Sequence, residues 1–149
     1  MTTDLRSVAR LDRARPFRRV QTIDTVRLAI ARLGPVIEAT DAAVTYELLP
    51  EVFGDALQLE TLFHGLLASA LRHRRTANPR IRITADVTEQ GWRFVVADNG
   101  TSRHDPDRDH TAAAFDLAIC RIIVERHGGK IWLEPGATGT AVHFTLRSR

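Results

Sequence analysis

The sequence predicts an α+β fold, a two-layer sandwich in which a mixed, mostly antiparallel sheet packs on about three helices. Three observations predict it. Helix and strand patterns alternate along the chain. Two pairs of strand patterns, over residues 81–97 and 130–146, are joined closely enough to be hairpins. Neither a dinucleotide glycine fingerprint nor a Gly-Lys-Ser/Thr phosphate loop occurs in the sequence. These patterns favour antiparallel neighbours over a doubly wound parallel sheet.

The composition is that of an ordinary globular protein. The chain has 149 residues, 44% of them hydrophobic and 26% charged, which suits one domain with its own core. No stretch approaches the ~20 apolar residues that cross a bilayer. The N-terminus lacks the apolar region of a secretion signal, and Asp4 and Asp12 argue against a transit peptide. The single cysteine, Cys120, excludes an internal disulfide and suits a reducing, cytoplasmic location.

The first twenty residues are rich in arginine, in a chain of net charge +3 and pI about 9.9. A nucleic-acid-binding arm and a solvated or frayed helix both suit this pattern. No aromatic stacking platform accompanies the arginines, which favours the second interpretation, so nucleic acid is not an expected partner. Residues 1–16 are expected to be a helical or disordered segment, with a short helix over 4–13 ended by Pro16. The domain itself is expected to cover residues 17–149.

The first part of the domain is expected to hold two strands and one helix. Residues 17–20 can start a strand or a docking segment. Apolar residues then recur at helical spacing over residues 24–38, with Pro35 placed to kink or end that helix early. Residues 44–48 alternate as a strand does, and Pro50 ends the pattern.

The clearest helix follows Asp55, which suits an N-terminal position, and continues to about residue 75. Arginines near its end suit the negative end of the helix dipole. Two strands, over residues 81–87 and 92–97, should follow as a hairpin. The apolar stripe of the helix consists of Leu59, Leu62, Phe63, Leu66, Leu67 and Ala70.

The last part of the chain begins with a polar stretch, residues 99–111, which is expected to be irregular. A helix is predicted over residues 112–127, and Gly128-Gly129 should end it. Two further strands, over residues 130–133 and 140–146, complete the predicted sheet.

Four stretches of the chain are similar, in order and spacing, to one known family. They are residues 49–55 (LPEVFGD), 95–100 (VVADNG), 117–132 (LAICRIIVERHGGKIW) and 139–146 (GTAVHFTL). From about residue 17 onward the chain resembles the catalytic, ATP-binding domain of sensor histidine kinases, in the gyrase–Hsp90–histidine kinase–MutL superfamily. It looks most like the kinases attached to PAS or phytochrome-type sensors. The resemblance implies the Bergerat ATPase fold and a role in bacterial two-component signalling.

The resemblance also implies a set of nucleotide-binding positions. Asp98 would accept a hydrogen bond from the adenine amino group, and Gly100 would let the backbone approach the purine closely. Arg72 matches a phosphate-contacting lysine, and His73 matches a position that flanks the base. Thr140, in the last similar stretch, completes the set. Taken alone, the sequence Asp-Asn-Gly also suits a plain turn.

The stretches that would bind phosphate and metal depart from the family pattern. Where the family has two asparagines one helical turn apart, this chain has Gly65 and Ser69. The Ser69 hydroxyl lacks the amide carbonyl that holds a hard cation, and Gly65 has no side chain. Thr101 stands where another glycine is expected, and residues 112–116 replace a glycine-rich run whose backbone amides cradle phosphates. Aspartate at the last of these positions would oppose the phosphate charges.

We therefore expect a degenerate histidine-kinase ATPase-like domain that acts as a protein-interaction module, with weak or absent ATP binding and no catalytic residues. No cofactor is expected, and ATP with magnesium would bind only if the site still functions. Its partner would be a receiver domain or a partner kinase, docked on residues 55–75 and 99–111. One alternative is an active kinase that phosphorylates a histidine in trans, since no histidine precedes His64. Another is an anti-sigma or phosphotransfer-type regulator, and a homodimer stays open.

Other reactive side chains suit structural roles. Histidines and aspartates over residues 104–110 have ligand chemistry, but their spacing matches no metal motif, and a solvated loop is the preferred interpretation. His127 is expected at the helix–Gly–Gly–strand corner, and His143 within the last strand. Cys120 lies among apolar residues and suits the core. No metal site and no serine nucleophile are predicted.

Overall fold

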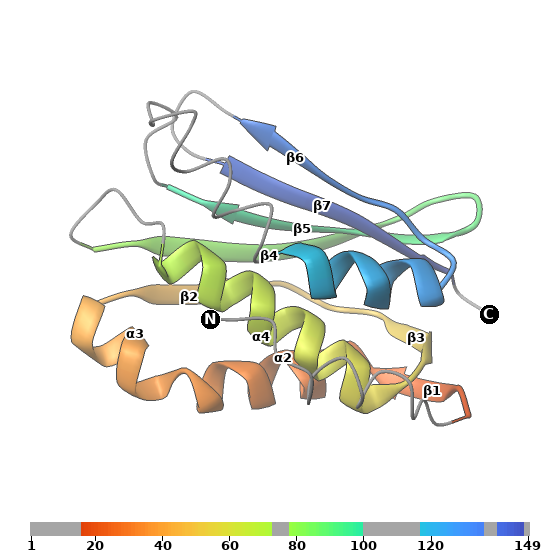
Figure 1. Cartoon of the computed structure of the whole chain (residues 1–149), viewed down its shortest axis with the longest axis horizontal. Coiled ribbons are helices and arrows are strands. Elements are labelled where there is room, and N and C mark those ends of the chain that lie inside the picture. Colours follow the sequence, from red (N-terminus) through yellow and green to blue (C-terminus); the bar gives the residue numbers. More distant parts are fainter. Residues whose placement is uncertain (1–15, 73–77, 100–116, 136–139, 148–149) are drawn as a thin grey trace.

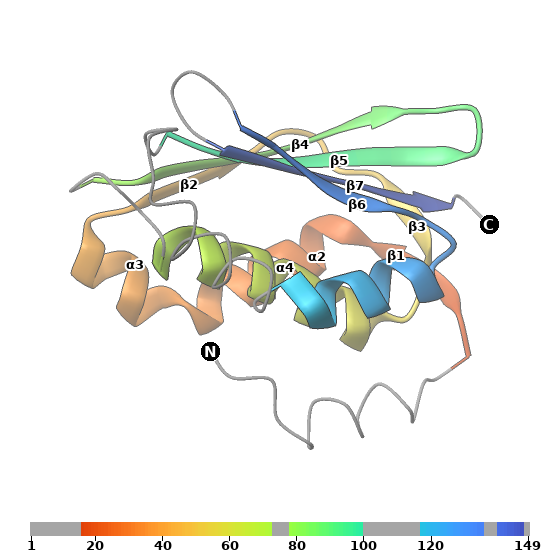
Figure 2. The same cartoon turned by 45° about the horizontal axis from the view of Figure 1, so that its top comes forward.

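The computed structural model describes residues 16–72, 78–99, 117–135 and 140–147 (Figure 1). These residues form two layers, with the helices lying on one face of a five-stranded sheet and a small two-stranded sheet standing at one end (Figures 1 and 2). The other face of the large sheet carries none of the described helices (Figure 2). The predicted two-layer α+β sandwich is therefore confirmed.

The large sheet is mixed and mostly antiparallel, as predicted. Its first edge strand runs parallel to its neighbour, and every other pair of neighbours is antiparallel. Both predicted hairpin pairings are present. In spatial order the strands are β2 (Ala43–Tyr46), β4 (Arg80–Val87), β5 (Gly91–Asp98), β7 (Thr140–Arg147) and β6 (Ile131–Pro135).

The helix predicted over residues 24–38 is two helices, α2 (Thr22–Arg32) and α3 (Gly34–Thr40). The chain breaks at Leu33, which has φ −97° and ψ 7°. Pro35 lies in the first turn of α3, where its fixed φ and its missing N–H are tolerated. The proline therefore starts the second helix, and the described residues contain four helical segments, one more than expected.

The small sheet consists of β1 (Arg18–Gln21) and β3 (Glu51–Gly54), paired antiparallel. The strand expected at residues 17–20 is confirmed, whereas β3 was not predicted. β3 has four residues, with Val52 and Gly54 buried and the other two exposed. So short a strand, next to a proline, gives too little alternation to be detected.

Helix α4 (Ala56–Arg72) is capped by the residue that the sequence indicated. The Asp55 carboxylate accepts hydrogen bonds from the backbone N–H groups of Leu57 and Gln58, at 3.0 and 3.1 Å. These are donors that a helix cannot satisfy internally. The predicted apolar stripe faces the sheet, with only Ala70 half-buried rather than buried. Phe63 lies in the core against Phe94 and Phe144, with ring centroids 5.8 and 5.7 Å away.

Replacing the cap with Asp55→Ala is expected to lower the free energy of unfolding by about 1–2 kcal/mol, because two backbone donors lose their acceptor in a buried place. Urea unfolding followed by circular dichroism measures the change. Asp24→Ala is the matched control, since Asp24 is exposed in the first turn of α2 and caps nothing. That control should change stability by less than about 0.5 kcal/mol. Equal effects of the two variants would contradict the capping role.

The described part of the last helix covers residues 117–126, called helix 117–126 below. Gly128 follows with φ +75°, a left-handed conformation that terminates helices, so the predicted Gly-Gly end is confirmed. Residues 112–116, the helix predicted over 4–13 and the loop after Asn99 lie outside the described residues. Among those that are described, every helix is too short or too polar to cross a membrane.

Candidate functional site

Asp98 is the last residue of β5 and lies on the sheet face that meets the helices. It pairs in register with Ile81 and has the same strand parity as Phe94 and Val96, which are buried in the core. Its side chain is half-buried, and its Oδ1 accepts a hydrogen bond from the Thr140 backbone N–H at 3.4 Å. Two of the predicted site residues are thus brought together across the ends of two neighbouring strands.

Asn99 fixes the backbone directly after this carboxylate. Its backbone N–H donates to the Arg80 carbonyl at 3.1 Å, and its Oδ1 accepts from the Arg80 N–H at 2.7 Å. The two bonds continue the pairing of β4 with β5 one residue beyond Asp98. The sequence placed Asn99 in the family-like stretch 95–100 or, alternatively, in a turn, and assigned it no contact with Arg80.

Gly65 lies buried on the side of α4 that faces helix 117–126. A Cβ added at this position would stand 3.0 Å from the Cys120 Sγ atom. The same thiol lies 3.8 Å from the Leu62 carbonyl oxygen, to which it donates. The space into which a longer side chain at position 65 would extend therefore holds Cys120.

Of the other predicted site residues, the structure describes Ser69 and Arg72. Ser69 is half-buried one turn beyond Gly65, and Arg72 is exposed at the end of α4. Gly100 and His73 lie outside the described residues, as do Thr101 and residues 112–116. The described part of the site therefore has two ends. One, the carboxylate end, is Asp98 with Thr140, and the other is the C-terminal part of α4 with Ser69 and Arg72.

Among the described residues, the Asp98 carboxylate has the chemistry to pair with a purine base, and α4 lacks the asparagines that the family pattern has at residues 65 and 69. A carboxylate in a half-buried position accepts hydrogen bonds from an exocyclic amine. Mg²⁺ requires oxygen ligands in near-octahedral geometry, and α4 offers one hydroxyl at Ser69 and no side chain at Gly65. No group of three or more His, Cys, Asp or Glu side chains that could hold a metal occurs in the part of the chain that the structure describes. The 104–110 stretch lies outside it.

His127 lies at the predicted corner between helix 117–126 and Gly128-Gly129, and it contacts three parts of the chain. Its Nε2 accepts the Asp55 backbone N–H at 3.1 Å, and its Nδ1–H donates to the Ile123 carbonyl at 2.8 Å. Phe17 stacks on the imidazole, with ring centroids 4.6 Å apart and planes at 17°. Burial lowers the pKa of His127, opposed by the bond to Ile123 and by Asp55. A structural role agrees with this geometry, and sequence reasoning missed the link to the α4 cap.

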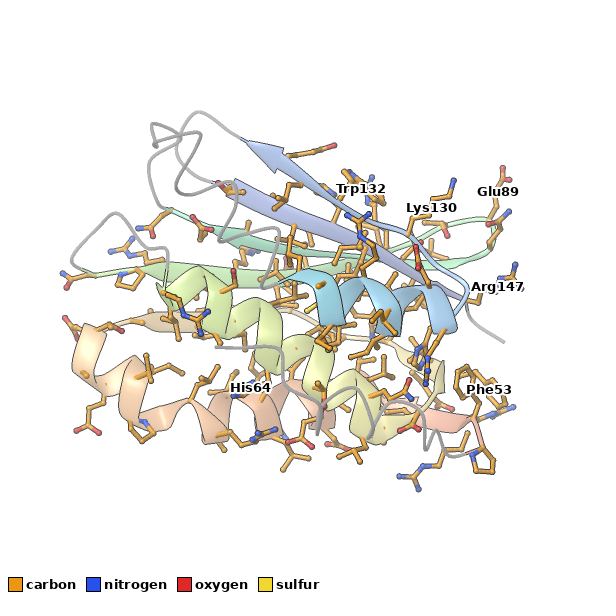
Figure 3. All side chains as sticks on the ribbon, viewed as in Figure 1. Phe53, His64, Glu89, Lys130, Trp132 and Arg147 are labelled. Carbon is orange, nitrogen blue, oxygen red and sulfur yellow. The ribbon has the colours of Figure 1, made fainter. Side chains whose placement is uncertain are left out.

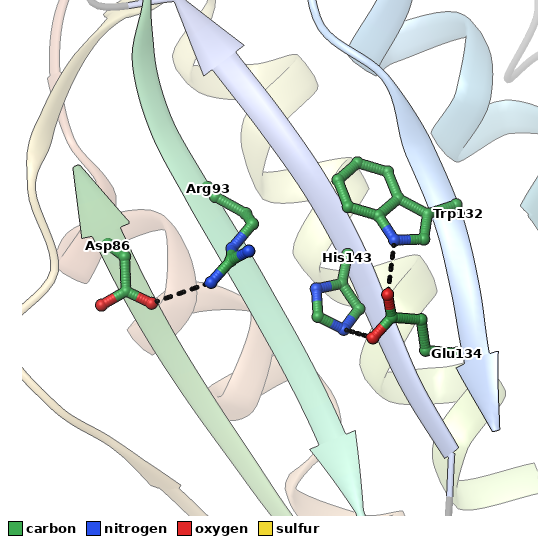
Figure 4. Close-up of polar contacts among 5 residues, drawn as sticks. All are labelled: Asp86, Arg93, Trp132, Glu134 and His143. Atoms are coloured by element: carbon green, nitrogen blue, oxygen red, sulfur yellow. Dashed lines mark hydrogen bonds and ion pairs between the residues drawn. The ribbon is translucent and has the colours of Figure 1, made fainter. Parts of the chain in front are cut away.

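His143 lies on the sheet face that turns away from the helices (Figure 4). Its Nε2 is 3.0 Å from a Glu134 carboxylate oxygen, and Trp132 stacks on the ring at 5.3 Å. The second oxygen of Glu134 accepts from the Trp132 indole N–H at 3.3 Å. On the same face Arg93 pairs with Asp86 at 3.5 Å. The His143 side chain is 12% exposed and that of Glu134 is 60% exposed, so the imidazole is largely covered by its neighbours on this face. These contacts agree with a structural role for His143.

His64 adjoins Gly65 on α4 and projects from the helical layer (Figure 3). Partial burial lowers the pKa of His64, and the positive charge of Arg32 lowers it further, while Glu60 opposes the shift. Arg32 and Glu60 themselves pair at 3.4 Å, joining α2 to α4. The imidazole is therefore neutral near pH 7.

Comparison with known proteins agrees with this fold. A family model described as "Histidine kinase-, DNA gyrase B-, and HSP90-like ATPase" matches residues 54–149. The phytochrome-like protein Cph1 of Synechocystis is 34% identical over 140 residues, which are 83% of this chain and 18% of that protein. Cyanobacterial phytochrome A of Nostoc is also 34% identical, over 79% of this chain and 17% of its own length. This chain thus spans less than a fifth of either relative.

Solved structures give the same fold. The catalytic domain of histidine kinase ThkA superposes with a TM-score of 0.75 at 20% identity, covering 90% of this chain and 97% of that one. ThkA has also been solved in complex with the response regulator TrrA, and that structure matches with a TM-score of 0.73 over 89% of this chain and 42% of the other.

Proposed function

Because the chain belongs to the family of histidine kinase-, DNA gyrase B- and HSP90-like ATPases, we propose that it is a histidine-kinase-type ATP-binding domain that now acts in two-component signalling as a protein-interaction module, with weak or absent ATP binding. The chain works in the cytoplasm, where its buried thiol at Cys120 stays reduced.

One observation carries this proposal. Gly65 is one of the two positions at which the family has an asparagine, and Cys120 Sγ stands 3.0 Å from where its Cβ would be. An asparagine there would have to displace the thiol, because contacts this short force a neighbour to move. Ser69, one turn further on, supplies a single hydroxyl where the family has an amide. Neither position therefore carries the amide that the family has there, one for the magnesium ion and one for polar catalysis.

Isothermal titration with ATP and Mg²⁺ tests the proposal, and no binding or only millimolar affinity is expected. A variant that restores both asparagines and makes room for them, Gly65→Asn with Ser69→Asn and Cys120→Ala, should bind at least about tenfold more tightly, or about 1.4 kcal/mol. The matched control places alanine at all three positions, which opens the same space without the amides. Micromolar binding by the unaltered chain would refute the proposal.

The proposed partner is a receiver domain or a partner kinase. The similarity to ThkA, which forms a complex with a response regulator, supports this choice. The accessible part of α4 is the proposed contact surface, where Leu57 is exposed and His64 is half-buried. Surface plasmon resonance against purified receiver domains and dimerisation domains from the same organism would identify the partner.

An active kinase that phosphorylates a histidine in trans is the second candidate. The geometry around Asp98 favours this candidate. The Asp98 carboxylate accepts a hydrogen bond from the Thr140 N–H, and the Asn99 side chain that follows accepts one from the Arg80 N–H. Radiolabelled ATP mixed with this chain and a candidate dimerisation domain decides between the two functions. Label on the partner's histidine supports the kinase, and its absence under every pairing supports the interaction module.

A further inference from the structure

β6 is an edge strand of the five-stranded sheet (Figure 1). It pairs with β7 on one side, and no described strand pairs with it on the other. Its Trp132 and Leu133 are large apolar side chains that stay exposed, at 36% and 39%. An exposed edge of this kind is a surface on which a further strand can pair. β6 therefore offers both backbone hydrogen bonds and apolar area to a partner.

The pairing of β6 with β7 determines which backbone groups point outward. The Thr145 N–H donates to the Lys130 carbonyl at 2.9 Å, and the Lys130 N–H donates to the Thr145 hydroxyl at 3.0 Å. The backbone groups of Lys130 thus point toward β7. Hydrogen-bonded and non-hydrogen-bonded positions alternate along an antiparallel pair. The N–H and C=O groups of Ile131 and Leu133 therefore point the other way, to the open edge.

The order of side chains along this edge is self-complementary about Trp132. Residues 130–134 read Lys-Ile-Trp-Leu-Glu, with an aliphatic residue on each side of the aromatic centre and opposite charges at the two ends. Two copies paired antiparallel across Trp132 place lysine opposite glutamate, isoleucine opposite leucine, and tryptophan opposite tryptophan, and all of these cross-strand pairs are favourable. β2, the other edge strand, reads Ala-Val-Thr-Tyr and has no such symmetry.

The same register suits the backbone. Ile131 and Leu133 of one copy face Leu133 and Ile131 of the other, so the groups that point outward can exchange hydrogen bonds. Shifting the register by one hydrogen-bonding step in either direction would place a charge opposite Trp132 instead of opposite its counter-charge. Charges on an edge strand normally discourage pairing between edges, whereas these two favour one partner and one register.

Trp132 is already held in place at the centre of this edge. Its ring stacks on His143 with centroids 5.3 Å apart, and its indole N–H donates to Glu134 at 3.3 Å (Figure 4). A side chain that is ordered before binding loses little conformational entropy on binding. Tryptophan is also enriched among the residues that contribute most to interfaces.

We propose that two copies of this chain associate through their β6 strands, paired antiparallel about Trp132, so that the two large sheets join into one. The interface is one strand wide, which is smaller than the roughly 1,200–2,000 Å² of stable complexes, so the dimer is weak. Its dissociation constant should be about 10–100 µM. The pairing uses none of the predicted nucleotide-binding positions, so the proposed function and this dimer can fail separately.

Sedimentation velocity on the full chain, from about 5 to about 500 µM, tests the proposal with two charge variants. Lys130→Glu places carboxylates opposite each other, and Glu134→Lys places ammonium groups opposite each other. Each variant alone should dimerise at least about tenfold more weakly than the unaltered chain. An equimolar mixture of the two should recover dimerisation to within about threefold, because a heterodimer restores an opposite-charge pair at both ends.

Single cysteines test the register. Across the two-fold axis, the Cα atoms of the two Trp132 residues would lie ~4.5 Å apart, within disulfide range, whereas those of the two Leu133 residues would lie ~8 Å apart, beyond it. Trp132→Cys should therefore form a cross-linked dimer at least about tenfold faster than Leu133→Cys under mild oxidation. Leu133 is the matched control because its exposure is similar. Cys120 is buried, and the unaltered chain measures any cross-linking through it.

The outcomes distinguish the β6 edge from other surfaces. Dimerisation that both charge variants weaken and that their mixture restores supports the proposal. A chain that stays monomeric at about 500 µM overturns it. Dimerisation that neither variant changes, or that mixing does not restore, uses another surface and overturns it as well. If circular dichroism shows that Glu134→Lys does not fold, the cysteine pair decides, and equal cross-linking rates overturn the proposal.

Discussion

Gly129→Ala is expected to cost about 3 kcal/mol of stability or more, or to prevent folding altogether. A Cβ at this position would stand 1.7 Å from the carbonyl oxygen of Thr145 and 2.6 Å from its carbonyl carbon. Both are backbone atoms of β7, and Thr145 is further fixed by a hydrogen bond from its N–H to the Lys130 carbonyl at 2.9 Å. No rotamer change can relieve the contact, so the corner between helix 117–126 and β6 would have to open.

Gly34→Ala is the matched control, because a Cβ at that position would meet nothing within 4 Å. Gly34 starts α3, so alanine there should be neutral or should stabilise the protein by up to about 1 kcal/mol. Chemical unfolding followed by circular dichroism compares the two variants with the unaltered chain. If Gly129→Ala unfolded at the same denaturant concentration as the unaltered chain, the close backbone approach described for this corner would be wrong.

His127→Ala is expected to lower the free energy of unfolding by about 2–4 kcal/mol. The Asp55 N–H loses its acceptor in a buried place, the Ile123 carbonyl loses a donor, and Phe17 loses the ring on which it stacks. The α4 cap and the start of the domain are both attached to this imidazole. His143→Ala is a control of equal size, on a sheet face that turns away from the helices (Figure 4), and it should cost less than about 1.5 kcal/mol.

The same imidazole makes stability depend on pH. Burial lowers the pKa of His127 below the ordinary value of 6.5, because the charged imidazolium loses its hydration, while the hydrogen bond to the Ile123 carbonyl and the charge of Asp55 oppose the shift. Between the lowered pKa and about 6.5, the unfolded chain binds a proton that the folded chain does not. Stability is therefore complete above about pH 6.5 and falls as the pH decreases through that window.

Urea midpoints measured from pH 7.5 to 5 should show this decrease, and His127→Ala should reduce its slope. His64 also has a lowered pKa and contributes with the same sign, so His64→Gln serves as the comparison. A slope that His127→Ala leaves unchanged would assign the pH dependence to other groups.

Local patterns made much of the fold predictable. The apolar stripe of α4 and its cap at Asp55 needed only a few neighbouring residues, and so did the hairpin of β4 and β5. The break at Leu33 was harder, because Pro35 can equally kink a helix or start a new one. β3 was missed because its four residues form a strand only through pairing with β1.

The site was predictable only in part, because its deciding contacts join distant residues. Asp98 and Thr140 were indicated by family resemblance, and the structure brings them together over 42 residues of sequence. The packing of Gly65 against Cys120 depends on how two helices approach each other, which no local pattern reports. The hydrogen bond between His127 and the Asp55 N–H joins residues 72 positions apart, so no local pattern predicts it either.

The pairing of β1 with β3 has a mechanical consequence. The chain passes from residues 1–15 into β1, a four-residue strand whose hydrogen-bonded partner is β3, and β3 continues directly into Asp55 and α4. Tension or torsion applied ahead of Pro16 would consequently reach α2, which follows β1 directly at Thr22, and would reach α4 through the pairing of β1 with β3, in neither case passing through the five-stranded sheet. The helix that carries Ser69 and Arg72 is thereby mechanically linked to β1 through a single strand pairing.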